Sequence, residues 1–230
     1  MENAMTALSA SPMSTSSAFD RGVPTPSRFW DRRAVDYAKK PVADERAYEQ
    51  TLERVRAHLL RNVRVLEIGC GTGTTALKLA ASAREILATD YSEEMIAIAR
   101  AKARAEVVSN VHFRTCTVHN SELGVGSFDV VLAMNLLHLL GDIPARLGRI
   151  HELLRPGGLF ISKTPCLGDQ GLLMRIVIPL MRALGIAPYV NFVSERSLTA
   201  DIEQAGFQIV ETGMYPKKTR SFFVVARKTP

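Results

Sequence analysis

The chain has 230 residues, 47% of them hydrophobic and 23% charged, with a formal net charge of +6 at pH 7. This length suits one sizeable core and is short for two complete domains, so one α/β domain is expected. Three cysteines, far apart and without a CxxC pair, argue against a disulfide framework or a structural metal and indicate a reducing cytoplasm. No apolar run reaches the roughly 18 residues of a membrane span, which predicts a soluble protein. The basic residues are scattered, as at Lys102 and Arg104, which favours solvated helix faces over a nucleic-acid surface.

The pattern of apolar residues divides the chain into a tail, a helical segment and an alternating region. Residues 1–27 are rich in Ser, Thr, Ala and Pro and are expected to form a disordered tail. Helical spacing over 28–61 predicts two helices separated at Pro41. Strands are then predicted at 63–68, 85–90, 111–116, 128–134 and 159–163, with helices at 74–81, 92–106 and 143–154 between them. This alternation predicts a doubly wound, mostly parallel, Rossmann-like sheet with helices on both faces.

The alternation of predicted strands and helices ends after Thr164. An apolar insert, residues 166–193, contains a stretch at 171–190 that Arg175 and Arg182 interrupt and that Pro179 is expected to kink or break. A helix capped by Ser194 follows, and then two strands, 207–212 and 221–226, joined by a short polar turn. Because so short a connection makes a hairpin, the last strand is expected to run antiparallel.

A glycine-rich loop follows the first predicted strand, in the segment VLEIGCGTG. Gly69, Gly71 and Gly73 allow a ligand to approach the backbone closely, and the helix from Thr74 points free N–H groups at an anionic part of that ligand. Gly71, Gly73 and Ala76 also satisfy the final-alanine variant of the dinucleotide-binding pattern G-x-G-x-x-G, with Asp90 at a suitable distance for ribose hydroxyls. However, Glu67 places a carboxylate beside the ligand, which would repel a pyrophosphate and favour a ligand that carries a cation.

Four segments together carry a family resemblance: VLEIGCGTG, ATDYSEEMIAIARAKA, SFDVVLAMNLLHLL and LLRPGGLFI. In this order they resemble the class I S-adenosylmethionine-dependent methyltransferases, especially the ubiquinone/menaquinone C-methyltransferase-like group, over about residues 28–227. The resemblance implies a seven-stranded sheet whose last strand is antiparallel, an N-terminal helical lid at 28–61, and a single methyltransferase domain at 28–230. It also implies S-adenosyl-L-methionine as the cofactor and methyl transfer as the reaction.

The resemblance further implies a set of cofactor-binding residues: Tyr37, Glu67, Gly69, Gly71, Gly73, Asp90, Tyr91, Met95, Thr117, Val118, Met134 and Asn135. Asp90 would accept both ribose hydroxyls, and its alternative role as a helix cap is disfavoured because Ser92 fills that role. For Tyr37, closing over the methionine end, and for Met95, bordering the adenine, a plain core position is an equal alternative. Many relatives place an aspartate after the third strand, where this chain has CTVHN, so the adenine contact falls to Thr117 or a backbone group.

His138, just past the fourth strand, is the candidate catalytic base, with His119 a distant second; the alternative for His138 is a histidine bonded to backbone.

The stretch MNLLH lacks the N/D-P-P-Y/F motif common in enzymes that methylate nucleobase amines, which argues against a nucleic-acid acceptor. The insert is interpreted as a lid over an apolar substrate, with a membrane-surface helix, a dimer contact or an extra core helix as alternatives. The sequence thus favours a cytoplasmic methyltransferase acting on a small, lipophilic molecule, and leaves its oligomeric state open. The alternatives are a nucleic-acid or protein methyltransferase, an NAD-dependent oxidoreductase and a non-catalytic S-adenosylmethionine-binding protein.

Overall fold

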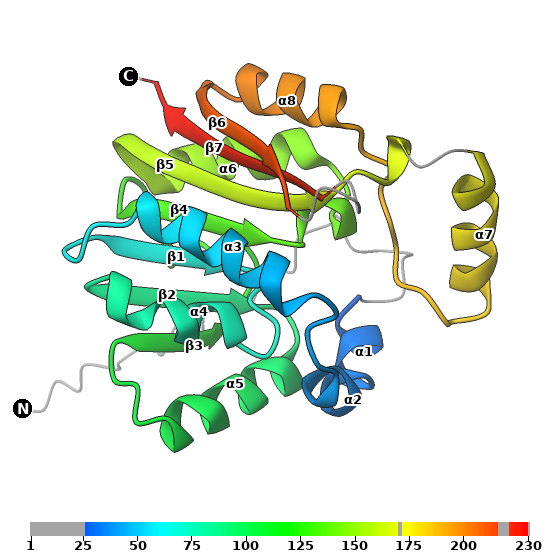
Figure 1. Ribbon diagram of the computed structural model, residues 1–230, viewed down its shortest axis with the longest axis horizontal. Helices are drawn as coiled ribbons and strands as arrows, with labels where there is room; N and C mark the ends of the chain where they lie inside the picture. The colour runs from blue at the N-terminus through cyan, green and yellow to red at the C-terminus, as the bar shows by residue number, and fades with distance from the viewer. Residues whose placement is uncertain (1–25, 170–171, 216–220, 230) are drawn as a thin grey trace, which may run out of the picture.

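A seven-stranded sheet forms the centre of the computed structural model, which describes residues 26–169, 172–215 and 221–229. The strand order is β3-β2-β1-β4-β5-β7-β6 (Figure 1). Their bounds are β1 Arg64–Ile68, β2 Glu85–Asp90, β3 Val111–Thr115, β4 Phe128–Met134, β5 Leu154–Pro165, β6 Phe207–Met214 and β7 Ser221–Lys228. Strands β1 to β5 pair in parallel, and β7 lies antiparallel between β5 and β6. The predicted fold class and the antiparallel last strand are therefore confirmed.

Helices cover both faces of the sheet because successive strand residues point to opposite sides and both sides are apolar. On one face lie α3 Glu45–Ala57, α4 Thr74–Leu79 and α5 Glu93–Ala105, which share a buried cluster with Val65. On the other lie α6 Ile143–Leu153 and α8 Glu195–Gln204, whose cluster includes Leu66. A short loop without an α-helix connects β3 to β4. The N-terminal helices and the apolar insert, described next, lie beyond the carboxyl ends of the parallel strands (Figure 1).

The N-terminal segment forms three helices where two are predicted. Helix α1, Pro26–Asp31, is separated from α2, Ala34–Lys39, by a tight turn in which the Arg33 N–H donates to the Trp30 carbonyl at 3.1 Å. The predicted break around Pro41 is confirmed, since α3 begins at Glu45. Residues 1–25 of the predicted tail lie outside the described residues, and α1 begins within its last two positions. Both short helices lie beyond the carboxyl ends of the strands (Figure 1).

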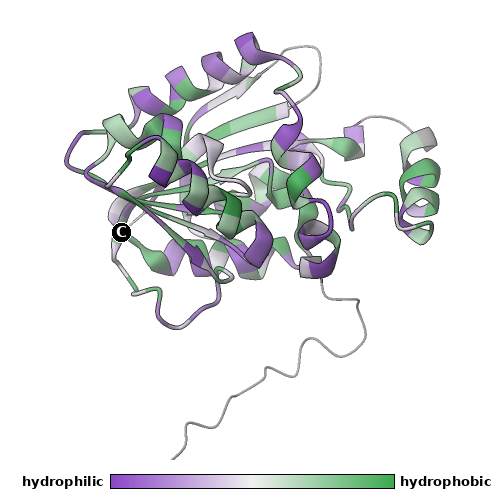
Figure 2. Cartoon of the chain, turned by 90° about the horizontal axis from the view of Figure 1, so that it is seen from below, coloured by the Kyte–Doolittle hydropathy of each residue, from purple (hydrophilic) through white to green (hydrophobic). Residues whose placement is uncertain are grey.

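The apolar insert forms helix α7, Leu172–Ala183, which continues through Pro179 instead of breaking there. This helix is set outward from the body of the molecule, also beyond the carboxyl ends of the parallel strands (Figure 1). Figure 2 shows it apart from the remaining elements and largely hydrophobic. None of its described side chains, 174–183, is buried, so the alternative of an extra core helix is wrong. No helix of the described residues has the length and apolar character needed to cross a membrane.

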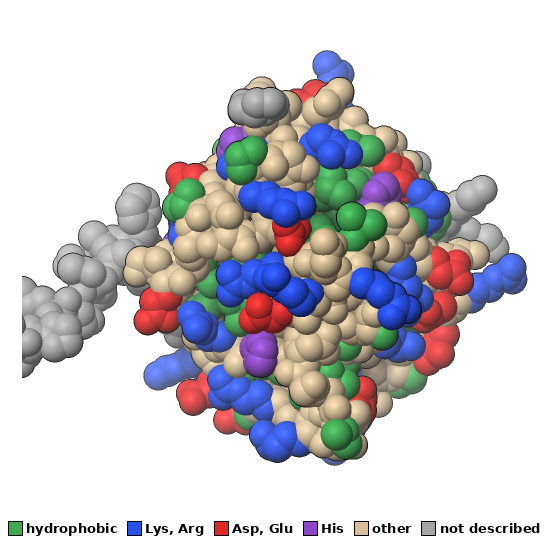
Figure 3. Space-filling model, turned by 90° about the vertical axis from the view of Figure 1, so that its left-hand side faces the viewer, with side chains coloured by type: hydrophobic (Ala, Val, Ile, Leu, Met, Phe, Trp, Pro, Cys, Tyr) green, Lys and Arg blue, Asp and Glu red, His purple; other side chains and the backbone are tan. Residues whose placement is uncertain are grey.

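The face at the amino ends of the parallel strands carries mixed charges (Figure 3). Lys and Arg side chains are spread over this face with Asp and Glu among them. Ion pairs such as Arg64–Glu85 and Arg155–Asp129 account for part of this mixture. The positive net charge therefore does not gather into a single patch on this side of the molecule.

Candidate functional site

The glycine loop joins β1 to α4 at the carboxyl edge of the sheet. Its glycines have positive φ angles, 64° at Gly69, 54° at Gly71 and 77° at Gly73, which other residues adopt only with strain. A Cβ atom at Gly69 would lie 2.4 Å from Leu136 Cδ1, and one at Gly73 would lie 2.6 Å from an aromatic ring on β3. A Cβ atom at Gly71 would meet, among the described residues, only the Tyr37 ring at 3.8 Å. Internal packing therefore requires Gly69 and Gly73, whereas Gly71 is where a ligand can approach the backbone.

Lys102 of α5 holds this loop in place. Its ammonium donates to the hydroxyls of Thr72 and Thr74, each at 3.1 Å, and burial lowers its pKa. The sequence groups Lys102 with the solvated charges, because a contact across about thirty residues leaves no local pattern. The structure instead makes it a support of the loop.

Asp90 ends β2 beside the glycine loop. Its Oδ2 accepts the Gly71 N–H and its Oδ1 accepts the Ser92 N–H, both at 2.9 Å. Burial raises its pKa, and these backbone hydrogen bonds oppose that shift. Ser92 caps α5 through its hydroxyl, which accepts the Met95 N–H, as predicted. Each carboxylate oxygen of Asp90 retains a further lone pair, so the side chain can accept two hydroxyl groups from a ligand.

Glu67 lies buried on β1, with 2% of its surface exposed. The Ala76 N–H donates to its carboxylate, while Oε2 has no hydrogen-bond partner among the described residues. Burial, together with the charge of Asp90, raises the pKa of Glu67 to about 8. A buried carboxyl group with an unpaired oxygen is costly on its own, and a cation beside it would offset that cost. These residues therefore fit a cofactor that carries positive charge.

The two short N-terminal helices, α1 and α2, lie at the start of the segment 28–61 that is predicted to form a lid, and they are tied to the chain following β2. The Ser92 hydroxyl donates to Asp31 Oδ1 at 2.6 Å, and the Trp30 indole hydrogen-bonds the Tyr91 hydroxyl. The rings of Trp30 and Tyr37 meet edge to face with centroids 6.0 Å apart. Asp90 and Glu67 both raise the pKa of Tyr37, after burial. The structure thus brings Tyr37 to the glycine loop, and Asp31 is a contact that sequence reasoning misses.

The predicted adenine side is divided between exposed and buried residues. Met95 is buried on α5, and Tyr91 is partly buried beside the lid. Val118 belongs to the core cluster on the α6 face, so its side chain is occupied by packing. Thr117 is exposed next to it. The preceding Cys116 N–H donates to the Asp90 carbonyl at 3.0 Å, which holds this loop beside Asp90.

The segment after β4 reaches the glycine loop from the other side. Asn135 has a positive φ of 54°, and its N–H donates to the Lys163 carbonyl at 2.7 Å. His138 lies in the turn Leu137–Leu139, partly buried, and its Nδ1 has no hydrogen-bond partner among the described residues. Burial lowers the pKa of His138 to about 4, so its ring is neutral near pH 7 and is a weak base. Met134, the last residue of β4, packs against the cluster under α3.

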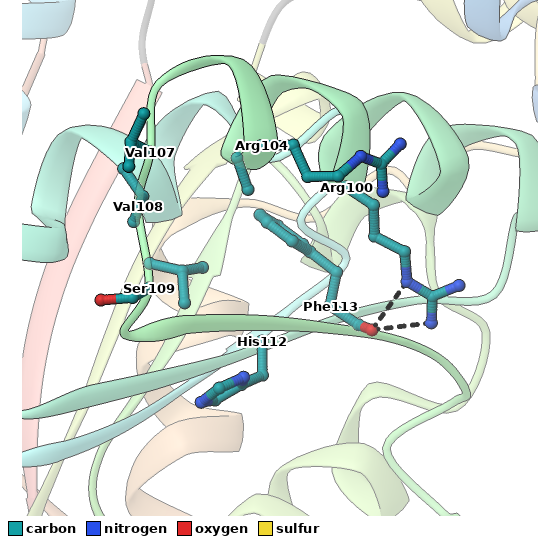
Figure 4. Close-up of a pocket in the computed structure, with 9 residues that line it drawn as sticks. Arg100, Arg104, Val107, Val108, Ser109, His112 and Phe113 are labelled. Carbon is teal, nitrogen blue, oxygen red and sulfur yellow. Dashed lines mark hydrogen bonds between the residues drawn. The ribbon is translucent and has the colours of Figure 1, made fainter.

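The second histidine candidate and a surface hollow lie elsewhere. Burial, and then Arg146 and Arg149 of α6, lower the pKa of His119, whose side chain is exposed. A hollow of about 550 Å³ lies where α5 ends and β3 begins (Figure 4). Within it the Arg100 guanidinium is already bound to the Phe113 carbonyl, at 2.8 and 3.2 Å. This hollow lies at the amino end of β3, and the ring of Phe113, which helps to line it, packs against Gly73.

Comparisons with known proteins agree with this geometry. A family described as "Methyltransferase domain" matches residues 65–158. A ubiquinone biosynthesis O-methyltransferase of Acinetobacter baumannii is 28% identical over 166 residues, which are 70% of each chain. The Xanthomonas euvesicatoria protein of the same name is 29% identical over 199 residues, 84% of this chain and 81% of the relative. These relatives carry O-methyltransferase names, whereas the sequence resemblance points to a C-methyltransferase-like group.

Solved structures show the same fold at low sequence identity. A geranyl diphosphate methyltransferase in complex with GPP and sinefungin has a TM-score of 0.67 at 13% identity, covering 79% of this chain and 77% of that one. SpnF, described as a cyclase, has a TM-score of 0.74 at 19% identity, covering 88% and 94%. The matched family and the relatives favour the methyltransferase interpretation over an NAD-dependent oxidoreductase. The matched domain and the relatives support a class I S-adenosylmethionine-dependent methyltransferase, an enzyme that uses S-adenosylmethionine as its cofactor.

Proposed function

We propose that this methyltransferase acts on a small, lipophilic acceptor in the cytoplasm. The observation that carries the proposal is the exposed apolar stripe of α7. Ile176 and Leu180 of α7, and Leu184 directly after its last residue, are each more than 60% exposed and recur every four residues, which places them on one side. Exposing such an apolar surface to water costs free energy, and an apolar molecule that covers it removes that cost. The three free cysteines suit a reducing compartment.

The lid and α7 are connected, which supports a role for α7 at the entrance to the site. The Arg33 guanidinium, next to α2, donates to the carbonyls of Gly185 and Ile186 at 3.1 and 3.2 Å. The same guanidinium lies over the Phe29 ring of α1, 4.1 Å from its centroid. The lid that carries Tyr37 is thereby tied to the end of α7. We interpret α7 as the acceptor-side part of this cover.

The residues of the site have separate tasks in this proposal. The cofactor supplies a methyl group on a positively charged sulfur. Asp90 accepts its ribose hydroxyls, Glu67 stabilises its positive charge, and Gly71 lets it approach the backbone. Tyr91, Met95 and Thr117 border the adenine, while Met134 and Asn135 line the methionine arm. Tyr37 and the rest of the lid exclude water and align the reacting groups, which is the main requirement of an in-line displacement.

The names of the relatives support a small-molecule acceptor, because they place those proteins in ubiquinone biosynthesis. The sequence lacks the motif of nucleobase amine methyltransferases, and the face in Figure 3 carries mixed charges. Both observations argue against a nucleic-acid acceptor.

The test is a methyl-transfer assay with radiolabelled S-adenosylmethionine and a cell extract, followed by extraction into organic solvent. We expect the label to enter the organic phase. The double variant Ile176→Glu/Leu180→Glu should lower this transfer about tenfold or more, since each residue contributes roughly 1.5–3 kcal/mol when covered. The control Leu60→Glu/Val125→Glu alters exposed apolar residues away from α7 and should leave it unchanged. Label found only in protein, nucleic acid or aqueous products would contradict the proposal.

The same stripe would also serve a peripheral membrane contact. Sedimentation of the wild type with anionic phospholipid vesicles, and its loss in Ile176→Glu/Leu180→Glu, would assign α7 to a membrane surface. Transfer that depends on α7 without sedimentation would assign it to the acceptor alone.

A further inference from the structure

Lys163 is a buried lysine at the carboxyl end of β5, with 8% of its surface exposed. Its ammonium donates to Thr51 Oγ1 of α3 at 3.2 Å, and it forms no ion pair with any described residue. The carboxylate that acts on it electrostatically is Asp44, which caps α3 by accepting the Ala47 N–H. Burial lowers the pKa of Lys163. Lysines are rarely buried unless they are paired, so the two remaining N–H donors call for a partner.

The position of Lys163 in the sheet places it near the reacting groups. It pairs with Met134 of β4 on one side and with Phe223 of β7 on the other. All three lie on the face that α3 covers, and neighbouring strands are about 4.8 Å apart. Met134 is the residue that the proposed function assigns to the methionine arm. The Lys163 side chain therefore lies on the strand next to the one whose end is assigned to the cofactor, which is the methyl donor.

A groove of about 460 Å³ opens between the start of α3 and the end of β6. Asp44 and Ala47 line one wall, and Tyr215 lines the other. The hydroxyl of Thr51, which accepts from Lys163, donates to the Ala47 carbonyl at 2.8 Å. The Tyr215 ring meets the ring of Phe223, the strand neighbour of Lys163, with centroids 5.6 Å apart. Lys163 does not itself line the groove, but Thr51 connects it to Ala47 of one wall and Phe223 connects it to Tyr215 of the other. The groove has a size that suits a small molecule.

We propose that the Lys163 ammonium is the counter-ion for an oxyanion of the acceptor, a phenolate or a carboxylate, bound at the inner end of this groove. This inference rests on the proposed function and adds the charge of the acceptor to it. An oxyanion attacks the methyl carbon without losing a proton: the O–C bond forms, the C–S bond breaks, and its electron pair stays on sulfur. No residue has to accept a proton in this step, which agrees with the weak basicity of His138.

The test uses binding, so that it does not depend on knowing the natural acceptor. The probes are 4-nitrophenol, whose phenolate is followed by its absorption, and benzoate, with 4-nitroanisole as a probe that cannot ionise. Each is titrated into protein saturated with S-adenosylhomocysteine. In the wild type, one of the two anions should bind, and bound 4-nitrophenol should remain ionised at lower pH than in water.

Lys163→Met keeps the apolar stem and removes the charge, so it should weaken binding of the anion about tenfold or more, while Lys163→Arg retains binding within a few-fold. Lys228→Met is the matched control: Lys228 donates to the His151 and Leu154 carbonyls at the far end of β7, and its loss should not affect the probes. Asp44→Asn keeps the helix cap and removes the nearby negative charge, so it should tighten anion binding.

Anion binding that is equal in the wild type and Lys163→Met, or absent from the wild type for both anions, overturns the inference. The inference is also overturned if Asp44→Asn does not tighten anion binding. This second variant keeps the test decisive if Lys163→Met does not fold. A lipophilic product in the extraction assay without dependence on Lys163 would leave the proposed function intact and refute this inference alone.

Discussion

Replacing Glu67 by glutamine should stabilise the empty protein and weaken its hold on the cofactor. The carboxyl group is buried, and its pKa of about 8 compares with an ordinary value of 4.5. The folded protein therefore keeps Glu67 protonated at pH values where the unfolded chain releases the proton. Taking up that proton costs free energy that glutamine, neutral in both states, does not require.

The sign and size of the effect depend on pH. Below about pH 4.5 the wild type and Glu67→Gln should be equally stable on this account, because Glu67 is protonated in both states. Between pH 4.5 and 8 the free energy of unfolding of the wild type falls by about 1.4 kcal/mol per pH unit relative to that of the variant. Above pH 8 the difference in stability between the two proteins is constant. At pH 7 the variant should gain at most about 3.5 kcal/mol in the free energy of unfolding.

Urea unfolding of the cofactor-free proteins at pH 5, 7 and 9 measures this gap, with Glu94→Gln on the exposed side of α5 as control. Calorimetry should show that cofactor binding to the wild type tightens as pH rises towards 8, because a cation favours ionised Glu67, and that the variant lacks this dependence. A variant that is less stable than the wild type at pH 9 would refute the reasoning, since it would mean that Glu67 is ionised and paired in the empty protein.

Three further outcomes follow from the geometry of the lid, the loop and the turn after β4. Asp31→Ala removes the charged hydrogen bond that holds the lid and should raise the cofactor dissociation constant about tenfold, whereas Asp36→Ala should not change it. Gly73→Ala should lower the melting temperature markedly, because its Cβ meets a ring at 2.6 Å, while Gly71→Ala should fold and lose cofactor affinity; equal melting temperatures would contradict this. His138→Gln should lower kcat/KM less than tenfold, and the wild-type profile should show no inflection near pH 6.5; a loss of about 100-fold would make His138 the base.

The fold could be predicted because each strand and helix of the alternating region carries its own local pattern. The strands β2 and β4 have the predicted bounds, and Ser92 and Ser194 cap helices at their predicted positions. Asp90 lies beside the glycine loop, as its position at the end of a predicted strand indicates. The break between α1 and α2 could not be predicted, because it depends on a tight turn and on contacts with residues some sixty positions away.

Parts of the candidate site escape sequence reasoning for the same reason. Asp31, Lys102 and Lys163 look like ordinary charged residues on helices or strand ends, and only the fold brings them to Ser92, to the glycine loop and to Thr51. The one local signal for Lys163 is a charge on the buried face of a predicted parallel strand. The exposure of α7 could not be read from its composition, because an apolar helix of this length is equally typical of a core.

The placement of β7 affects how this enzyme is made in the cell. Residues 221–228 lie between β5 and β6, and Phe223, Val224 and Val225 are fully buried. Until these residues leave the ribosome, β6 has no partner and β5 exposes an apolar edge. Sheet closure therefore waits for the last of the seven described strands, and a chain stopped before Ser221 would present that edge to chaperones and proteases.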